Sequence, residues 1–292
     1  DRTAIPQITV RQVQDNLIPV PKNSEQQKIT NLLNEKTQMI DEIIADTKQS
    51  ITELKAYKQS LITEAVTKGL DPNVEMKDSG VEWIGEVPEE WSRAKVKQLV
   101  VSKITDGPHT TPELQDKGIP FVSAEAVKNG IIDLNYKRGY ISKEDHEKFS
   151  EKVMPKMDDI FMVKSGATTG NIGIVRTEEV FDVWSPLALI RVKKELISVK
   201  FMYYYLQSNL FRKQVELNWS FGTQQNIGMG VIEQLLVWFP NLNEQNTIMA
   251  WLEEKCIKVD DLIKSKEQLI ADYKSYKKSL IYEYVTGKKQ VI

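Results

Sequence analysis

The chain has 292 residues, 41% of them hydrophobic and 27% charged, so it can bury a core and is not disordered as a whole. Its net charge of −2 excludes a general polyanion binder, so any contact with nucleic acid must come from a local patch. One cysteine and two histidines exclude a disulfide framework and a structural zinc cluster. No apolar run reaches the ~18 residues of a membrane span. We therefore expect no metal, no cofactor and no membrane contact, and a cytoplasmic location, because the N-terminus lacks a signal-peptide pattern.

A long internal repeat organises the chain. Two pairs of segments align at the same offset of 219 residues: 25–36 (EQQKITNLLNEK) with 244–255 (EQNTIMAWLEEK), and 56–67 (AYKQSLITEAVT) with 275–286 (SYKKSLIYEYVT). Of the 45 positions from Glu25 to Gly69, 19 are identical in the second copy, and Pro21 aligns with Pro240. Chance does not produce such a match, so the chain contains two copies of one long segment.

Each copy predicts a long helix. Ser24 and Asn243 stand at N-cap positions, Gln27 stands where a capping box requires Glu or Gln, and Gly69 and Gly287 are natural stops. Apolar residues recur every seven positions: Leu33, Ile40, Leu54 and Leu61 in the first copy, and Leu252, Val259, Tyr273 and Leu280 in the second. A companion seam is expected from Ile29, Ile43, Tyr57, Ile248, Leu262, Leu269 and Tyr276. This spacing favours a coiled coil about 65 Å long over the alternative of two ordinary surface helices.

The residues between the two copies have another character. Residues 70–92 form a turn-rich linker with two prolines. Short β-like runs follow at 119–122, 160–163, 172–175, 183–192 and 235–239, and residues 199–217 have helical spacing. We interpret residues 78–240 as one mixed α/β domain.

The motifs of catalysis are missing. Residues 166–173 (GATTGNIG) lack the Lys-Ser/Thr of a P-loop, and His146-Glu147 has no second histidine four residues on. A nucleophile elbow, GxSxG, does not occur. His109 lies in a loop, where a lone histidine is more often a polar contact than a catalyst. We therefore do not expect an active site in this chain.

Three polar, glycine-containing loops remain: 105–112 (TDGPHTTP), 164–171 (KSGATTGN) and 219–228 (WSFGTQQNIG). Their Lys, Thr, Ser, Asn and Gln side chains suit hydrogen bonds to base edges and phosphates. Each loop alone could equally be an ordinary turn. Residues 78–240 carry 20 Lys/Arg against 22 Asp/Glu, which argues against a broad basic surface.

The chain resembles the specificity subunits of type I restriction-modification systems over nearly its whole length. The resemblance lies in the repeated Pro-x-x-x-Glu-Gln-x-x-Ile entry to each helix, in 77–91 (KDSGVEWIGEVPEEW), in 158–175 (DDIFMVKSGATTGNIGIV) and in GTQQNIG. It implies a non-catalytic subunit whose α/β target recognition domain reads DNA. It also implies two long helices that form an antiparallel coiled coil and dock methyltransferase subunits, and through them restriction/translocase subunits.

One departure from the family pattern concerns the first recognition domain. Residues 1–23 match only the closing segment of such a domain, and its body is absent, so we expect self-association of half-subunits to restore two domains. The expected organisation is: closing segment 1–23, first helix 24–69, linker 70–77, recognition domain 78–240, second helix 241–287 and tail 288–292.

We therefore predict a protein that recognises one half of a bipartite target in double-stranded DNA. Candidate contacts are His109, Thr110, Thr111, Lys164, Ser165, Thr168, Thr169, Asn171, Trp219, Thr223, Gln224, Gln225 and Asn226, with Lys137 and Arg138 adding phosphate contacts. Two alternatives stay open: a coiled-coil scaffold or partner-sequestering half-subunit without sequence-specific DNA binding, and an enzyme with an unrecognised site.

Overall fold

The computed structural model describes residues 11, 14, 18–221 and 225–291. The chain divides into two compact units, one formed by residues 1–56 with 258–292 and the other by residues 57–257. Two long helices, α2 (Asn23–Lys68) and α8 (Leu242–Val285), contribute to both units. Their 46 and 44 residues occupy the two copies of the sequence repeat, for which residues 24–69 and 241–287 were expected to be helical.

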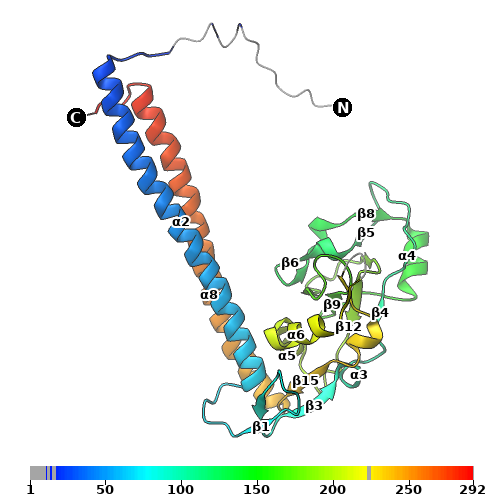
Figure 1. Ribbon diagram of the computed structural model, residues 1–292. Helices are drawn as coiled ribbons and strands as arrows, with labels where there is room; N and C mark the ends of the chain where they lie inside the picture. Colours follow the sequence, from blue (N-terminus) through cyan, green and yellow to red (C-terminus); the bar gives the residue numbers. More distant parts are fainter. Residues whose placement is uncertain (1–10, 12–13, 15–17, 222–224, 292) are drawn as a thin grey trace. The chain divides into compact units, whose positions relative to one another are not determined.

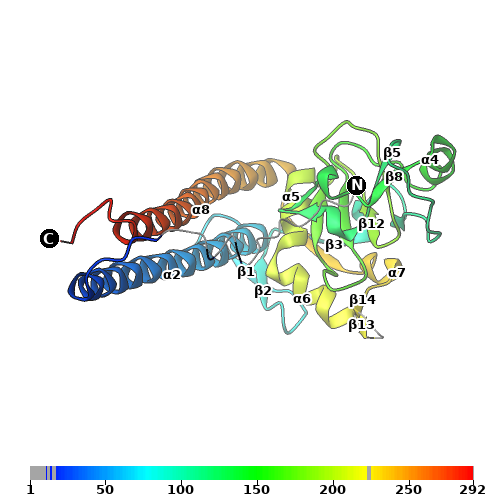
Figure 2. The ribbon, with the colours of Figure 1, turned by 90° about the horizontal axis from the view of Figure 1, so that it is seen from above.

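The first unit is an antiparallel pair of helices (Figures 1 and 2). Ile40 and Ile44 of α2 pack with Leu280 of α8. Seven residues after Ile44, Ile51 of α2 packs with Val259 and Ile263 of α8. Because residue numbers rise along α2 while they fall along α8, the two helices run in opposite directions. The predicted antiparallel coiled coil is confirmed.

The companion seam of this coiled coil was predicted wrongly. Five of its members are 38–54% exposed: Ile43, Tyr57, Leu262, Leu269 and Tyr276. The buried row instead contains Ile44 and Ile51. These lie four residues after the heptad positions Ile40 and Thr47, whereas the predicted companion seam lies three residues after such positions. Ile43 and Ile44 are neighbours about 100° apart around the helix. The hydrophobic pattern fits either row, and only the position of the partner helix decides which one is buried.

The helix starts use a repeated glutamine. Gln26 Nε2 donates to the carbonyl oxygen of Pro21 at 2.7 Å, and the equivalent Gln245 Nε2 donates to that of Pro240 at 2.8 Å. Ser24 and Asn243 lie inside the first turns of α2 and α8, so they are not the N-caps. The expected capping-box residue, Gln27, donates to Asn31 Oδ1 instead. The Pro-x-x-x-Glu-Gln pattern therefore defines a local start motif for both helices.

The second unit is mixed α/β, as expected (Figure 1). A six-stranded sheet has the order β4 (Thr105–Asp106), β12 (Leu187–Ile190), β9 (Ile160–Val163), β10 (Ile172–Ile174), β7 (Ile131–Ile132), β6 (Val127–Lys128). A three-stranded sheet has the order β11 (Asp182–Val183), β5 (Ile119–Val122), β8 (Gly139–Ile141). The β10–β7 and β11–β5 pairs are parallel, and the other strand pairs of these two sheets are antiparallel.

Shorter elements complete the unit. Three further two-stranded pairs are β1 (Met76–Asp78) with β2 (Glu86–Pro88), β3 (Ser92–Lys95) with β15 (Leu236–Phe239), and β13 (Ser220–Phe221) with β14 (Gln225–Asn226). The helices are α3 (Val96–Leu99), α4 (Lys143–Ser150), α5 (Val199–Gln207), α6 (Asn209–Asn218) and α7 (Met229–Ile232), with 3₁₀ turns η1 (Ala124–Ala126) and η2 (Leu134–Tyr136). The strands are short, so much of the unit consists of loops.

Two predicted elements are interrupted. The run 183–192 divides into β11 and β12 because Leu187 N–H donates to the Trp184 carbonyl oxygen in a turn. The helix predicted for 199–217 breaks at Ser208, whose hydroxyl oxygen accepts the Phe211 N–H and caps α6. The first break shapes the site described below, because it turns the segment 184–186 out of the sheet.

The core of this unit joins the sheet to the ends of both long helices. Ile62 and Val66 near the end of α2 and Ile248 and Leu252 near the start of α8 share one buried cluster with Phe201 of α5. Trp91, just before β3, donates its indole N–H to Glu244 Oε1 at 3.0 Å. These contacts fix the α/β domain to the parts of the helices that belong to the same unit.

Candidate nucleic-acid interface

A buried carboxylate links the first two polar loops. Asp106 ends β4 at the start of loop 105–112 and is fully buried. Its carboxylate oxygens lie 2.6 Å from Lys152 Nζ, 3.1 Å from Lys164 Nζ and 3.2 Å from His109 Nε2. Burial alone would raise the pKa of Asp106, but the hydrogen bonds and charges of Lys152 and Lys164 outweigh it and hold that pKa below its usual value. The ionised carboxylate therefore fixes Lys164 beside the first loop.

Backbone hydrogen bonds link the second loop to the third. Ile227 N–H donates to the Lys164 carbonyl oxygen at 2.8 Å, and Gly166 N–H donates to that of Gln225 at 3.0 Å. Ser165 and Asn226 form an isolated β-bridge. Gly166 has φ = 100°, a left-handed conformation that a side chain would strain. Loops 164–171 and 219–228 therefore form one surface over residues 164–166 and 225–227.

A fourth segment, residues 184–186, belongs to the same surface. Ser185 N–H donates to the Pro108 carbonyl oxygen at 3.2 Å, and Lys164 N–H donates to that of Pro186 at 2.8 Å. Gly107 permits this approach, because a Cβ there would lie only 1.9 Å from the Val183 carbonyl oxygen. Sequence reasoning missed this segment because it was predicted to lie inside one continuous strand.

The structure gives the predicted residues different degrees of exposure. The exposed ones are His109, Thr110, Thr111, Arg138, Thr168, Asn171 and Asn226. The partly exposed ones are Lys137, Lys164, Ser165, Trp219 and Gln225. Thr223 and Gln224 lie outside the described residues. These exposed and partly exposed side chains offer hydrogen-bond donors and acceptors to a ligand.

Thr169 is a correction to the sequence analysis. The side chain is fully buried, and its hydroxyl donates to the Gly166 carbonyl oxygen at 2.7 Å. It also lies 3.2 Å from the Gln225 carbonyl oxygen. Thr169 therefore closes the second loop onto the third and is not available for a DNA contact in this structure.

Two further groups of predicted residues contact side chains outside the three loops. Arg212 of α6 joins Asn171 to Trp219: its Nη1 lies 3.4 Å from Asn171 Oδ1, and its Cζ lies 5.8 Å from the centre of the Trp219 ring. Lys137 Nζ lies 5.1 Å from the centre of the Tyr140 ring. Asp106, Lys152 and Trp184 were not predicted at all, since nothing in their local sequence distinguishes them.

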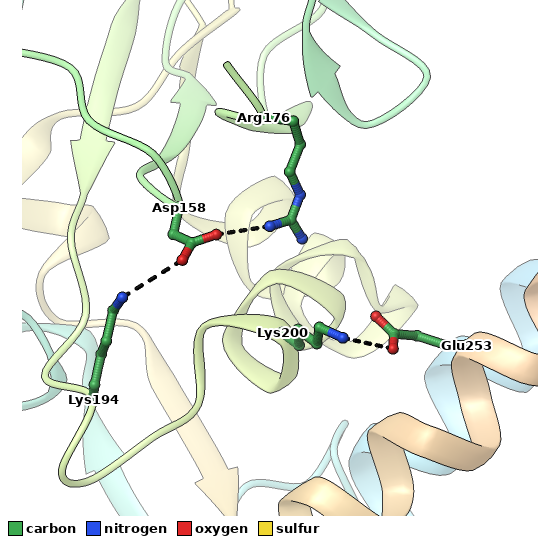
Figure 3. A network of polar contacts seen from close by, with 5 residues as sticks. All are labelled: Asp158, Arg176, Lys194, Lys200 and Glu253. Atoms are coloured by element: carbon green, nitrogen blue, oxygen red, sulfur yellow. Dashed lines mark hydrogen bonds and ion pairs between the residues drawn. The ribbon is translucent and has the colours of Figure 1, made fainter. Parts of the chain in front are cut away.

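Several cations elsewhere in the domain are neutralised by carboxylates (Figure 3). Asp158 pairs with Arg176 at 2.7 Å and with Lys194 at 3.5 Å, and Lys200 of α5 pairs with Glu253 of α8 at 2.7 Å. Such pairing agrees with the near balance of charge in residues 78–240. These three cations are therefore less available to a polyanion than unpaired ones would be.

A partly buried histidine pairs with a buried aspartate next to the fourth segment. His146 Nδ1 of α4 lies 2.6 Å from Asp182 Oδ2 of β11, and Asp182 is fully buried. Burial raises the pKa of Asp182 above its usual value, although the hydrogen bond and charge of His146 act in the opposite direction. Asp182 lies two residues before Trp184, so the pair anchors the strand from which the fourth segment leaves.

The described residues offer neither a metal site nor a membrane span. They contain no group of three or more His, Cys, Asp or Glu side chains arranged to hold a metal ion. None of the described helices combines the length and the apolar character that a membrane crossing requires.

The chain is similar to known proteins over most of its length. Residues 88–287 match the family model described as the type I restriction modification DNA specificity domain. The MjaVIII type I restriction enzyme specificity subunit of Methanocaldococcus jannaschii is 24% identical, over 99% of this chain and 66% of the relative. The EcoBI type I restriction enzyme specificity subunit of Escherichia coli is 23% identical, over 96% of this chain and 60% of the relative.

Solved structures show the same fold. A chain from a structure of a type I R-M system has a TM-score of 0.70 at 18% identity, over 99% of this chain and 66% of that one. The HsdS subunit from Thermoanaerobacter tengcongensis has a TM-score of 0.53 at 17% identity, over 98% of this chain and 64% of that one. The chain thus spans between 60% and 66% of the length of these relatives.

Proposed function

Because the chain belongs to the type I restriction modification DNA specificity family, we propose that it recognises a DNA sequence and directs partner methyltransferase subunits to it. Residues 78–240 read one half of a bipartite target, and the chain itself catalyses no reaction. Restriction/translocase subunits join through the methyltransferase subunits.

The observation that carries this proposal is the convergence of the loops. Residues from 105–112, 164–171, 184–186 and 225–228 are tied together by Asp106 and by backbone hydrogen bonds. The loop surface so formed presents Thr, Ser, Asn, Gln and Lys side chains, which read base edges and bind phosphates. A rigid frame beneath polar side chains is what direct readout requires, since it fixes the donors and acceptors in register with the bases.

The test replaces the exposed loop side chains without disturbing their frame. In the complex with its methyltransferase partner, a variant with Thr110→Ala, Thr168→Ala and Asn226→Ala should lose preference for the target, by about 1–3 kcal/mol per base contact removed. Unchanged modification of the same sites by this variant would show that the assigned surface is wrong. Partner binding without any sequence preference in the unmodified chain would favour the scaffold alternative.

The exposed apolar residues of the two long helices favour methyltransferase docking. Ile43 and Leu262 occupy equivalent positions of the repeat, and both are exposed. Tyr57 and Tyr276 are likewise equivalent and exposed. Exposed large apolar side chains at matching positions in both copies mark two equivalent surfaces. Two copies of one partner would fit these surfaces, so we assign them to methyltransferase subunits.

The repeat also exposes one face that its other copy buries. Ile62 and Val66 of α2 are 4% and 0% exposed under the α/β domain, whereas their equivalents Ile281 and Val285 of α8 are 39% and 52% exposed. The equivalents of Glu244 and Gln245 are Glu25 and Gln26. Glu244 accepts the Trp91 indole N–H and Gln245 Oε1 accepts the Ser198 N–H, whereas Glu25 and Gln26 are exposed. We infer that a second recognition domain of the same build covers this face.

Self-association is the source of a second domain that the chain itself can supply. Light scattering of the full chain should then show a dimer that Ile281→Glu with Val285→Glu dissociates. Leu262→Glu, on the surface assigned to the methyltransferase, is the matched control and should leave the dimer intact. A monomer at every concentration would contradict self-association.

A further inference from the structure

One arginine beside the loop surface contacts both an aromatic ring and a carboxylate. Arg138 follows η2, and its guanidinium carbon lies 4.6 Å from the centre of the Trp184 ring. Its Nη1 lies 3.4 Å from Glu125 Oε1, and its backbone N–H donates to the Phe121 carbonyl oxygen at 2.9 Å. The guanidinium group therefore contacts the Trp184 ring and lies within ion-pair distance of the Glu125 carboxylate.

The aromatic platform is part of the frame that joins the loops. Trp184 N–H donates to the Val122 carbonyl oxygen at 2.8 Å, and the next two residues bond to Pro108 and Lys164. The Trp184 indole Nε1 is buried without a hydrogen-bond partner among the described residues, and the ring lies under the Arg138 guanidinium. Arg138 is thus carried by the segment that touches both of the first two loops.

Stacking leaves the donors of a guanidinium free at its edges. An arginine held in this way can donate two parallel hydrogen bonds to O6 and N7 of guanine, the most common specific contact in the major groove. A phosphate contact makes no such demand on orientation, because a flexible lysine serves equally well. Glu125 occupies the donor edge in this structure and is itself exposed, so a base edge can replace it.

We propose that Arg138 reads a guanine in the target half-site, that Trp184 positions its guanidinium, and that Glu125 holds its donors until DNA replaces it. This inference rests on the proposed function and names a specificity-determining contact within it. It departs from the expectation that Arg138 contacts a phosphate.

The chain offers a matched control in Arg176. Its side chain is 43% exposed, against 40% for Arg138, and it likewise pairs with one carboxylate, Asp158. Figure 3 shows its ion pair with Asp158. Among the described residues, Arg176 is not placed over an aromatic ring, unlike Arg138. Removing either arginine deletes the same charge, so a difference between them reports the role of the site.

The experiment measures binding of the complex with methyltransferase to the target and to a panel in which each base pair is changed in turn. Arg138→Ala should lose about 5- to 150-fold of its preference at one G·C pair and keep the rest of the pattern. Arg138→Lys, which keeps the charge but loses the planar fork of donors, should weaken the same preference while keeping the salt dependence of binding. Arg176→Ala should leave the pattern unchanged.

Two results would overturn the inference. Weaker binding of Arg138→Ala to every sequence alike, with a salt slope reduced by about 1, would identify a phosphate contact. An unchanged pattern would remove Arg138 from recognition altogether. Trp184→Phe is a second variant that tests the same contact if Arg138→Ala fails to fold. It keeps a smaller aromatic face and should weaken the same G·C preference. Absence of any sequence preference in the unmodified complex would instead refute the proposed function.

Discussion

Asp106 is the residue on which the loop surface depends most. The pKa of its carboxyl is lowered in the folded state, because Lys152 and Lys164 outweigh the cost of burial. We predict that Asp106→Asn lowers the free energy of unfolding by about 1–3 kcal/mol at pH 7, since the charged hydrogen bonds are lost. Chemical denaturation measures this difference. Asp158→Asn, which removes a more exposed ion pair, should cost less than about 1 kcal/mol.

The pH dependence of the stability lost in Asp106→Asn follows from the lowered pKa of Asp106. A carboxylate with a lowered pKa stabilises the fold above its unfolded pKa of about 3.9, and this contribution is lost as the pH falls through the lower folded value. The difference between Asp106→Asn and the unmodified chain should therefore shrink below about pH 4. A difference that stays constant down to acid pH would contradict the ion-pair role.

Asp182 should behave in the opposite way. Burial raises its folded pKa, so the folded state binds this proton more tightly than the unfolded chain does. Its favourable contribution is present below about pH 4 and is lost as the pH rises through the folded pKa. We predict that the unmodified chain loses stability relative to Asp182→Asn over this rise, measured by thermal unfolding at a series of pH values. Glu147→Gln, an exposed change on α4, the helix that carries His146, should show no such trend.

At the scale of elements, the coiled coil buries one of two neighbouring isoleucines and leaves the other exposed. Ile44 is 8% exposed and packs with Leu280, whereas Ile43 is 38% exposed. Ile44→Ala should therefore cost about 2–4 kcal/mol of unfolding free energy, and Ile43→Ala less than about 0.5 kcal/mol. Urea unfolding followed by helical circular dichroism measures both. Equal losses would mean that the two rows share the interface.

The elements also show where sequence patterns succeed. The heptad repeat predicted both long helices, and apolar runs predicted β5 and β9, since these signals depend on residues near in sequence. The break at Ser208 and the split of 183–192 were missed. Ser208 caps a new helix only because the chain turns there. The segment 184–186 leaves the sheet, and its Ser185 N–H donates to the carbonyl oxygen of Pro108, which is 77 residues earlier in the sequence.

At the scale of the whole molecule, the repeat predicts two equivalent docking surfaces. We predict that Ile43→Glu and Leu262→Glu each weaken binding of one of two methyltransferase copies, because each places a charge in an apolar contact. Sedimentation of the complex should show loss of one copy for each single variant and of both copies for the double variant. Sequence preference of any remaining DNA binding should be unaffected, since the loop surface is unchanged.

The sequence alone determined that this chain has two related long helices and one α/β domain between them, and that it resembles DNA specificity subunits. The repeat, the heptads and the motif residues carry this information. They determined this because helix periodicity and recurring motifs are local properties. Only the tertiary structure decided which apolar row is buried, that Thr169 faces inward, and that Asp106 and Trp184 join the loops. Those outcomes depend on contacts between residues far apart in the chain, for which a single sequence holds no local signal.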